Sequence, residues 1–439
     1  MTTGMFDSFI TRHWFSAEAK HIWSDLQTLQ AWLDVEAALA QAQARLGVIP
    51  ADVAVPIADA CRHERFDTDR LSRDIAYAQH PFVPVLRQLE EFSGEPAAGY
   101  IHWGATTQNI FDTGVALQMQ RTQALINTNL GNAVTALGEL ALAHRDTLQA
   151  GRTHGQHALP MTFGFKVTGW LEELRRDRQR LQDRIRPSFV ASLGGAIGTF
   201  AAMGSKGPAV EAEMASILGL EPAILPMRSS FDRATDYFCA LALLAGTAEK
   251  IAQDIVFMQR TEIGEVEEAF HMGKVGSSTM AQKRNPSTAL LLISLCRLLS
   301  ARLPLLLGSM VRMDEGDSSA TNVADVAVPE IAILAASVAE TLARLATGLV
   351  VHDDAMQRNI DITNGLIVSE AAMMQLSDRL GRHKAHHLLY EAAQRSVMEG
   401  VPFTQAIAEH PEMAGLDMVT LDTAGYTGVS GALIERLAR

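Results

Sequence analysis

The sequence is poor in cysteine, and it has fewer basic than acidic residues. Its 439 residues include three cysteines, Cys61, Cys239 and Cys296, which lie far apart without C-x-x-C spacing. This pattern predicts buried, reduced thiols rather than a disulfide framework or a metal site. The 37 Lys and Arg residues against 50 Asp and Glu give a net charge of −13. That balance argues against a nucleic acid or an anionic membrane as partner, so we expect small molecules and further copies of this chain.

Uninterrupted hydrophobic runs of membrane-spanning length are also lacking. The two most apolar stretches, 288–311 and 327–351, carry charges such as Arg297 and Glu330, and neither supplies the run that a bilayer requires. The first seven residues show no basic region followed by an apolar one, so no secretory signal is visible and a cytoplasmic location is expected.

Sustained apolar/polar alternation, the mark of half-buried strands, is absent, and helical periodicity dominates. The sequence therefore predicts an all-α fold. Residues 24–46 are typical: Ser24 is suited to cap the helix, and an apolar stripe runs to Gly47. Similar patterns predict helices over 122–148 and 161–186.

Three longer predicted helices are apolar on more than one face: 236–263, 287–311 and 327–350. Such helices must be buried on most sides, and we expect them to pack against the same helices of other subunits in a homo-oligomeric bundle. We predict an N-terminal helical domain over 1–110, a central long-helix domain over 111–351 and a small C-terminal helical domain over 352–439.

Residues 276–285, Gly-Ser-Ser-Thr-Met-Ala-Gln-Lys-Arg-Asn, combine hydroxyls, a cation and an amide donor in one short stretch. A serine can act as a base only if its alkoxide is stabilised, and an ammonium together with backbone N–H groups provides that field. Lys283 and Asn285 are equally suited to a substrate carboxylate. The alternative is an ordinary surface loop.

Three further polar segments are candidate site loops. Thr106 and Thr107 would form an anion-binding helix start, or simply cap an amphipathic helix. His154, at an expected helix boundary, is suited to carry a proton near neutral pH, or only to cap the loop. His157 follows at i+3, but the segment has no Cys, Asp or Glu to complete a ligand set, so zinc is not expected. Arg228 and Arg233 suit bidentate carboxylate binding, or a salt-bridged helix start.

Together these segments resemble the fumarase/aspartase superfamily, in particular the branch of adenylosuccinate lyase and 3-carboxy-cis,cis-muconate cycloisomerase. The resemblance extends over about residues 15–410. It rests on 276–285 and on His102-x-Gly-x-Thr-Thr-Gln, Arg152-Thr-His-Gly-Gln, Gln259-Arg-Thr-Glu-Ile-Gly-Glu-Val and Asp361-Ile-Thr-Asn-Gly-Leu. It implies a three-domain all-α homotetramer in which three subunits contribute to each active site.

The resemblance also implies roles for single residues. Ser277 corresponds to the general base, and His154 to the acid that protonates the leaving group. Substrate contacts are implied for His102, Thr106, Thr107, Gln108, Thr153, Gln156, Lys283 and Asn285. No metal and no organic cofactor is expected, because stabilisation of a dianion is the main demand. Asn109 and Ala281 depart from the residues usual in this branch, Asp and Pro respectively.

Residues 318–322, Ser-Ser-Ala-Thr-Asn, narrow the range of possible substrates. They lack the arginine expected to bind the phosphate of adenylosuccinate, and residues 322–326 lack the tryptophans of the cycloisomerase branch. We therefore expect a carbon–nitrogen lyase that releases fumarate from an N-substituted aspartate such as iminodisuccinate. Cycloisomerase and adenylosuccinate lyase activity, and an inactive structural protein of the superfamily, are the alternatives.

Overall fold

The structure, a computed structural model, describes residues 4–271, 273, 276–414 and 421–438. The described chain is almost wholly helical, with two small antiparallel strand pairs, so the all-α prediction is confirmed. It divides into two units. The first unit comprises Met1–Leu130, Asp177–Gly246 and Ser294–Glu340, and the second comprises Gly131–Arg176, Thr247–Ile293 and Thr341–Arg439.

Five long helices contribute residues to both units: α6 (Thr107–Ala143), α7 (Phe163–Ser188), α9 (Asp232–Met258), α10 (Ser287–Ser300) and α12 (Ser318–Thr347). The other helices of the first unit are α1 (Ala17–Ile22), α2 (Asp25–Arg45), α3 (Ala54–Ala60), α4 (Thr68–Ala78), α5 (Val83–Ser93), α8 (Gly207–Leu218) and α11 (Leu303–Gly308). The second unit adds β1 (Leu148–Thr153), β2 (Gln156–Thr162), β3 (Val266–Glu267), β4 (Val350–Val351), α13 (Asp353–Asp361), α14 (Ser369–Leu380), α15 (Arg382–Glu399), α16 (Phe403–Ala408) and α17 (Ser430–Ala438). Short 3₁₀ helices cover Arg12–Trp14, His63–Arg65, Ala97–Tyr100, Gly204–Lys206, Leu366–Val368, Pro411–Met413 and Ala424–Tyr426.

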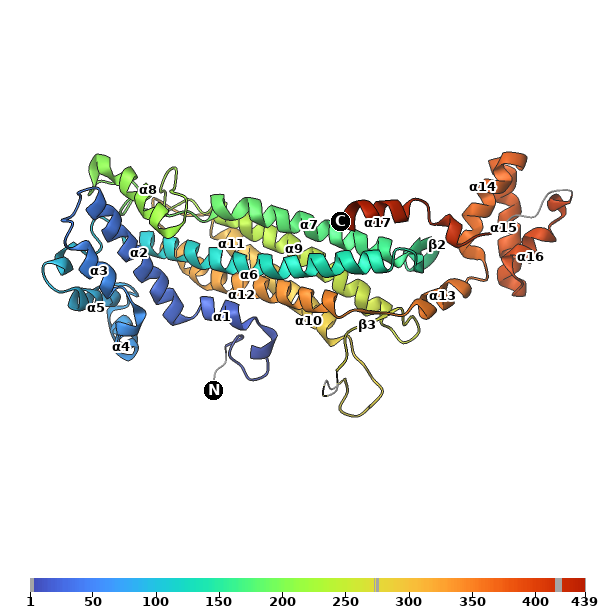
Figure 1. Ribbon diagram of the computed structural model, residues 1–439, viewed down its shortest axis with the longest axis horizontal. Coiled ribbons are helices and arrows are strands. Elements are labelled where there is room, and N and C mark those ends of the chain that lie inside the picture. Colours follow the sequence, from blue (N-terminus) through green and yellow to red (C-terminus); the bar gives the residue numbers. More distant parts are fainter. Residues whose placement is uncertain (1–3, 272, 274–275, 415–420, 439) are drawn as a thin grey trace. The chain divides into compact units, whose positions relative to one another are not determined.

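Helix α2 forms where the sequence predicts it. The Ser24 hydroxyl accepts the backbone N–H of Gln27 at 3.4 Å, which caps the helix as expected. Its apolar stripe, with Leu29 and Leu33, is buried. In the first unit α2 packs on α3, and α5 packs on α3 and α4, so these short helices form one group (Figure 1).

The predicted helix over 287–311 is interrupted, because α10 ends at Ser300 and α11 begins at Leu303. Pro304 lies in the first turn of α11, where its missing N–H costs nothing, whereas inside a continuous helix it would remove a hydrogen bond. Helix α6 begins at Thr107, well before the predicted residue 122. Its first turns contain many polar residues, so the helical spacing of the apolar side chains there is hard to recognise in the sequence. Gln108, for example, donates to Asp112 at 2.7 Å.

Residues 148–162 form a β-hairpin, so the expected helix boundary at His154 is wrong. Strand β1 pairs with β2, and Thr153 lies opposite Gln156. The two turn residues, His154 and Gly155, have φ of 53° and 78°. Positive φ at both central positions defines a type I′ turn, whose twist matches that of the strands.

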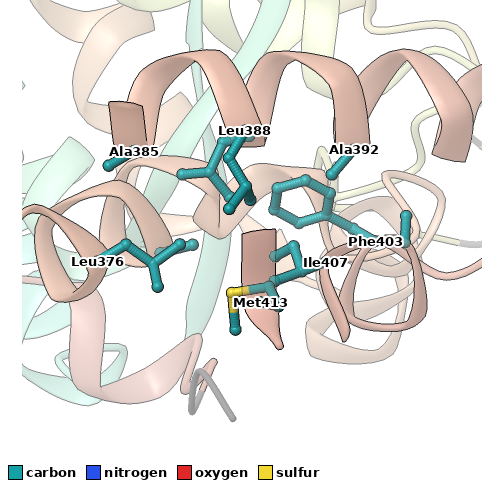
Figure 2. Packing of buried hydrophobic residues seen from close by; sticks show 10 residues of the cluster. Leu376, Ala385, Leu388, Ala392, Phe403, Ile407 and Met413 are labelled. Carbon is teal, nitrogen blue, oxygen red and sulfur yellow. The ribbon is translucent and has the colours of Figure 1, made fainter. Parts of the chain in front are cut away.

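The C-terminal helices α14, α15 and α16 share a hydrophobic core within the second unit (Figure 2). Leu376, Leu388, Phe403, Ile407 and Met413 are buried in it. Contacts join α14 to α15 and α15 to α16. The division into three domains stays a prediction.

Two segments are apolar and long enough to cross a bilayer, judged by length and composition alone: Ser287–Gly308 and Ser318–Thr347. In α12, 78% of the most apolar window is buried, as in the core helix of a globular protein. In the segment of α10 and α11 only 28% of the most apolar window is buried. Leu305 and Leu307 are among its exposed residues.

Candidate functional site

The loop 276–285 is organised around the side chain of Ser277. Its Oγ accepts the backbone N–H groups of Met280 at 3.0 Å and Thr279 at 3.3 Å. The Asn285 amide closes the loop by donating to the carbonyl of Gly276 at 2.6 Å. A methyl group at position 276 would overlap the carbonyl oxygen of Lys283, so this close approach requires glycine.

These contacts favour negative charge on Ser277. Two N–H dipoles point at the oxygen before any reaction, and such preorganised donors stabilise an alkoxide more than mobile water does. The side chain of Lys283 is exposed, and Ser277 is half-buried. The loop can thus hold an oxyanion while its cation remains accessible to a substrate.

The hairpin tip presents Thr153, His154 and Gln156 to solvent in the single chain. The hairpin is built from β1 and β2 of the second unit, which also holds the Ser277 loop. Burial, together with the nearby Arg152 guanidinium, lowers the pKa of His157 on β2. His157 is therefore neutral at physiological pH, while His154 at the tip is open to a ligand.

In the first unit, α6 begins at Thr107, and Thr106 lies directly before it. An anion-binding helix start at these two residues requires a helix that begins here. The side-chain carbonyl of Asn109 accepts the N–H of Thr106 at 3.1 Å and that of Gly195 at 3.2 Å. The amide nitrogen of Asn109 is buried without a hydrogen-bond partner in the structure. An asparagine here holds the turn without adding negative charge to the helix start.

His102 is held by a buried carboxylate. Glu36, 1% exposed, accepts the His102 backbone N–H at 3.2 Å and faces its ring Nδ1 at 2.6 Å. A carboxylate at this distance requires a proton on Nδ1, which leaves Nε2 of a neutral ring as an acceptor. The His102 backbone has a φ of 57°, and its contacts with Glu36 hold both the backbone N–H and the ring.

Two adjoining cavities lie in the first unit, of about 260 Å³ and about 100 Å³, and share Asp112, Phe231 and Arg312. Gln108 lines the larger and Arg233 the smaller. Burial raises the pKa of Asp112 to about 6, although its contact with Gln108 and the nearby Arg312 oppose this shift.

Arg228 and Arg312 are held by backbone carbonyls. Arg228 donates to the carbonyl of Ala196 at 2.6 Å, and Arg312 donates to that of Arg228 at 2.7 Å. The guanidinium of Arg312 lies 4.5 Å from the centre of the Phe231 ring.

Burial raises the pKa of Glu211 to about 7, although the Leu193 N–H and Arg233 oppose the shift.

The predicted site residues are divided between the two units. The first unit holds His102, Thr106, Thr107, Gln108, Arg228 and Arg233; the second holds Thr153, His154, Gln156, Ser277, Lys283 and Asn285. Among the residues that the structure describes, no group of three or more His, Cys, Asp or Glu side chains is arranged to hold a metal ion.

Two buried glutamates were missed by the sequence reasoning. Glu36 orients His102, and Glu265 accepts the guanidinium of Arg152. Glu36 interrupts the apolar stripe of α2, and a charge on a buried helical face was the available signal. Glu265 belongs to a motif on which the resemblance rests, but that motif carried no chemical role.

A family described as "Lyase" matches residues 15–299, and one described as "Adenylosuccinate lyase C-terminus" matches residues 365–437. The chain belongs to this lyase family, the fumarase/aspartase superfamily. One similar member is the N-acetyl-S-(2-succino)cysteine lyase of Dickeya dadantii (strain 3937), 35% identical over 96% of this chain and 94% of that protein. Another is the 3-carboxy-cis,cis-muconate cycloisomerase of Pseudomonas putida, 37% identical over 94% of this chain and 98% of that protein.

The fold of the family is confirmed by a solved structure. The fumarate lyase from Mesorhizobium sp. BNC1 superposes with a TM-score of 0.90 at 34% identity, covering 97% of this chain and 98% of that one. Members of the family thus bear names that describe both lyases and cycloisomerases.

Proposed function

We propose that the protein is a cofactor-independent lyase that releases fumarate from a succinyl-substituted amine by anti-elimination. Membership in the lyase family supports the reaction class. The observation that carries the proposal is the pair of backbone N–H groups directed at Ser277 Oγ, at 3.0 and 3.3 Å. Two preorganised donors at one serine oxygen suit a serine base, because they would stabilise its alkoxide.

In the proposed reaction the Ser277 alkoxide removes a proton from the methylene carbon next to one substrate carboxylate. The electron pair left on carbon is delocalised into that carboxylate, and Lys283 and Asn285 are the groups we assign to hold the resulting dianion. The pair then forms the double bond as the carbon–nitrogen bond breaks. His154 protonates the departing nitrogen, so the products are fumarate and the free amine.

The remaining candidates are assigned to substrate binding. Thr106, Thr107 and Gln108 would bind the second carboxylate at the positive end of α6, with His102, Thr153 and Gln156 as further polar contacts. Arg228 and Arg233 would bind carboxylates of the substituent. This assignment favours aminopolycarboxylates such as iminodisuccinate.

Sulfur is the second leaving atom to be tested. The relative from Dickeya dadantii is named as a lyase of a succinyl group carried on the sulfur of cysteine. The same proton abstraction serves both leaving atoms, because only the bond broken afterwards differs. A thiolate leaves more readily than an amine, so a sulfur substrate needs His154 less.

Adenylosuccinate fits the first unit poorly. The start of α12 is capped by Asp317, whose carboxylate accepts the N–H of Ser319 at 2.9 Å and that of Met313 at 3.0 Å. A carboxylate there repels a phosphate at the helix end that would otherwise attract one.

3-Carboxy-cis,cis-muconate cycloisomerase activity is the second candidate function. It is favoured by the relative from Pseudomonas putida, which is named for that reaction and matches at 37% identity. Lactonisation also passes through a carbanion stabilised by a carboxylate, so the same loop would serve.

We further propose a homotetramer in which three subunits contribute to each active site. The exposed apolar residues of α10 and α11, such as Leu305 and Leu307, support this assembly, because apolar surface of this kind is typical of subunit contacts. Sedimentation of the purified protein tests it: a monomer at micromolar concentration would exclude the shared site.

The experiment that tests the function uses purified protein with iminodisuccinate, N-acetyl-S-(2-succino)cysteine, adenylosuccinate and 3-carboxymuconate. Fumarate or lactone formation is followed by ultraviolet absorbance and chromatography. Ser277→Ala should reduce turnover by about 10²–10⁴-fold, whereas Ser278→Ala, its exposed neighbour, should not. Lactone without fumarate would favour the cycloisomerase; activity that survives Ser277→Ala would exclude the proposed base.

A further inference from the structure

The segment Gln259–Glu268 contacts both candidate catalytic segments of the second unit. It follows α9 and includes β3. The proposed reaction leaves this segment without a role, although the resemblance rests partly on it. Its glutamates make different contacts: Glu265 faces the hairpin, and Glu267 and Glu268 face the Ser277 loop and the start of α10.

Glu265 is fully buried, and both carboxylate oxygens are occupied. Arg152 donates to Oε1 at 2.5 Å and to Oε2 at 3.0 Å. Gln149 donates to Oε2 at 2.7 Å, and Asn359 of α13 donates to Oε1 at 2.8 Å. Burial disfavours the ionised form, but these hydrogen bonds outweigh it and lower the pKa of Glu265.

The contact with Arg152 fixes the strand that leads to His154. Arg152 lies in β1 two residues before the turn, at the point where the strand register shifts after Ala150. Its guanidinium also lies 5.6 Å from the centre of the Phe257 ring of α9. The bidentate pair prevents the guanidinium from rotating, so the end of β1 keeps one orientation.

The other side of the segment fixes the loop that carries Ser277. The Glu267 carboxylate pairs with the Arg284 guanidinium at 2.9 Å, and Gln259 donates to the Arg284 carbonyl at 3.2 Å. Glu268 accepts the N–H groups of Thr288 and Ala289 at 3.0 and 2.6 Å, which caps α10 where the loop ends. Arg284 directly follows Lys283, so these contacts also hold the backbone next to the lysine.

We propose that Glu265 and Glu267 are positioning residues for the two halves of the reaction. Glu265 holds, through Arg152, the hairpin that carries His154, and Glu267 holds, through Arg284, the loop that carries Ser277. This inference rests on the proposed function. Neither glutamate touches the substrate; each acts through an arginine, and displacement of a reacting group by about 1 Å can cost about 10²-fold in rate.

The test compares Glu265→Gln and Glu267→Gln in the full chain. Amide hydrogen exchange followed by mass spectrometry reports separately on residues 148–162 and 276–290. Glu265→Gln should speed exchange in the hairpin while the loop stays at the wild-type rate, and Glu267→Gln should do the reverse. Each should lower kcat by about tenfold or more with little change in KM, because orientation rather than binding is lost.

Glu91→Gln is the matched control. Glu91 forms an exposed ion pair with Arg70 at 2.6 Å in the first unit. Its replacement by Gln therefore removes one negative charge, as the two test variants do, without changing either segment. Glu265→Asp keeps the charge and should retain part of the rate, which a purely steric role would not allow. The double variant Arg152→Gln with Glu265→Gln should lose no more rate than the worse single variant, since the two residues act as a unit.

Wild-type exchange in both segments of both variants would overturn the inference, as would equal losses in the Glu91→Gln control. If Glu265→Gln fails to fold, the comparison of Glu267→Gln with Glu265→Asp still decides. The exchange measurement needs no substrate. The proposed function fails instead if the wild-type protein, with both segments protected, releases no fumarate.

Discussion

Glu36 on α2 binds both the backbone N–H and the ring Nδ1 of His102. A residue 66 positions away thereby sets which ring nitrogen is left without this contact. We predict that Glu36→Gln reverses the tautomer or releases the ring, because an amide can donate to Nδ1 where the carboxylate can only accept. The rate constant kcat/KM should fall about tenfold, corresponding to about 1.4 kcal/mol.

Nitrogen NMR of the His102 ring checks this prediction. The wild-type protein should show a proton on Nδ1, and Glu36→Gln should change that pattern. Glu18→Gln in α1 is a control for charge alone, since Glu18 is exposed. An unchanged His102 signal in Glu36→Gln would show that the ring takes its orientation from elsewhere.

Gly276→Ala tests whether the shape of the loop, rather than Ser277 alone, carries activity. The added methyl would meet the carbonyl oxygen of Lys283, so residues 276–285 must rearrange and the donors to Ser277 Oγ must move. We expect turnover to fall by about 10²-fold or more, since misplacement of about 1 Å has that effect. Thermal unfolding should change little, because the loop residues around it are largely exposed.

Gly99→Ala is the control for Gly276→Ala, because a methyl group at Gly99 meets no atom within 4 Å. Turnover of Gly99→Ala should equal that of the wild-type protein. Equal turnover in both variants would mean that the loop tolerates another shape, and the role of Gly276 would be lost.

The fold was predictable where local signals agree with burial. Helix α2 has a Ser24 cap and an apolar period that its packing uses, so its limits follow from the sequence. The hairpin at His154 was missed because its strands are short, include Arg152 and Gln156, and show no sustained alternation. Only the two positive φ values at His154 and Gly155 reveal the turn, and histidine is an uncommon residue there.

The candidate site was predictable in its segments but not in its support. Motifs single out the segments of Ser277 and His154, and the resemblance to the family implies a role for each residue. Glu36 and Glu265 lie 66 and 113 positions from the residues that they hold, and no local pattern joins such distant partners. Their roles depend on tertiary packing, which a single sequence does not display.

The pH dependence of stability should report on Asp112. Burial raises its pKa from 3.8 to about 6, so the folded state binds this proton more tightly than the unfolded state does. Its contribution therefore lowers stability as pH rises from about 4 through about 6, and the penalty is complete above that range. Asp112→Asn removes the charge and should stabilise the protein at pH 8 by about 1–2 kcal/mol.

Thermal unfolding measured from pH 4 to pH 8 checks the Asp112 prediction. The melting temperatures of wild type and Asp112→Asn should converge at the acidic end and separate as pH rises. Asp325→Asn is a second test variant, because burial also raises the pKa of the Asp325 carboxyl. A constant difference across the whole range would show that the substitution acts through packing or through Gln108 instead.

His154→Asn separates the acid from the turn that presents it. Asparagine followed by glycine is the preferred pair for a type I′ turn, so the hairpin should keep its shape. The melting temperature of the protein should therefore not fall. What the variant loses is the imidazole that we assign as proton donor. An amine needs that proton to depart, whereas a thiolate leaves without it, so the loss should depend on the leaving atom.

We therefore expect His154→Asn to lower kcat by about 10²–10⁴-fold with a nitrogen substrate and by far less with its sulfur analogue. His157→Asn is the matched control on the same hairpin, since burial and Arg152 already keep that histidine neutral. Single-turnover measurements with both substrates check the difference. Equal losses for nitrogen and sulfur would assign His154 to binding rather than proton transfer, and another group would then have to protonate the leaving atom.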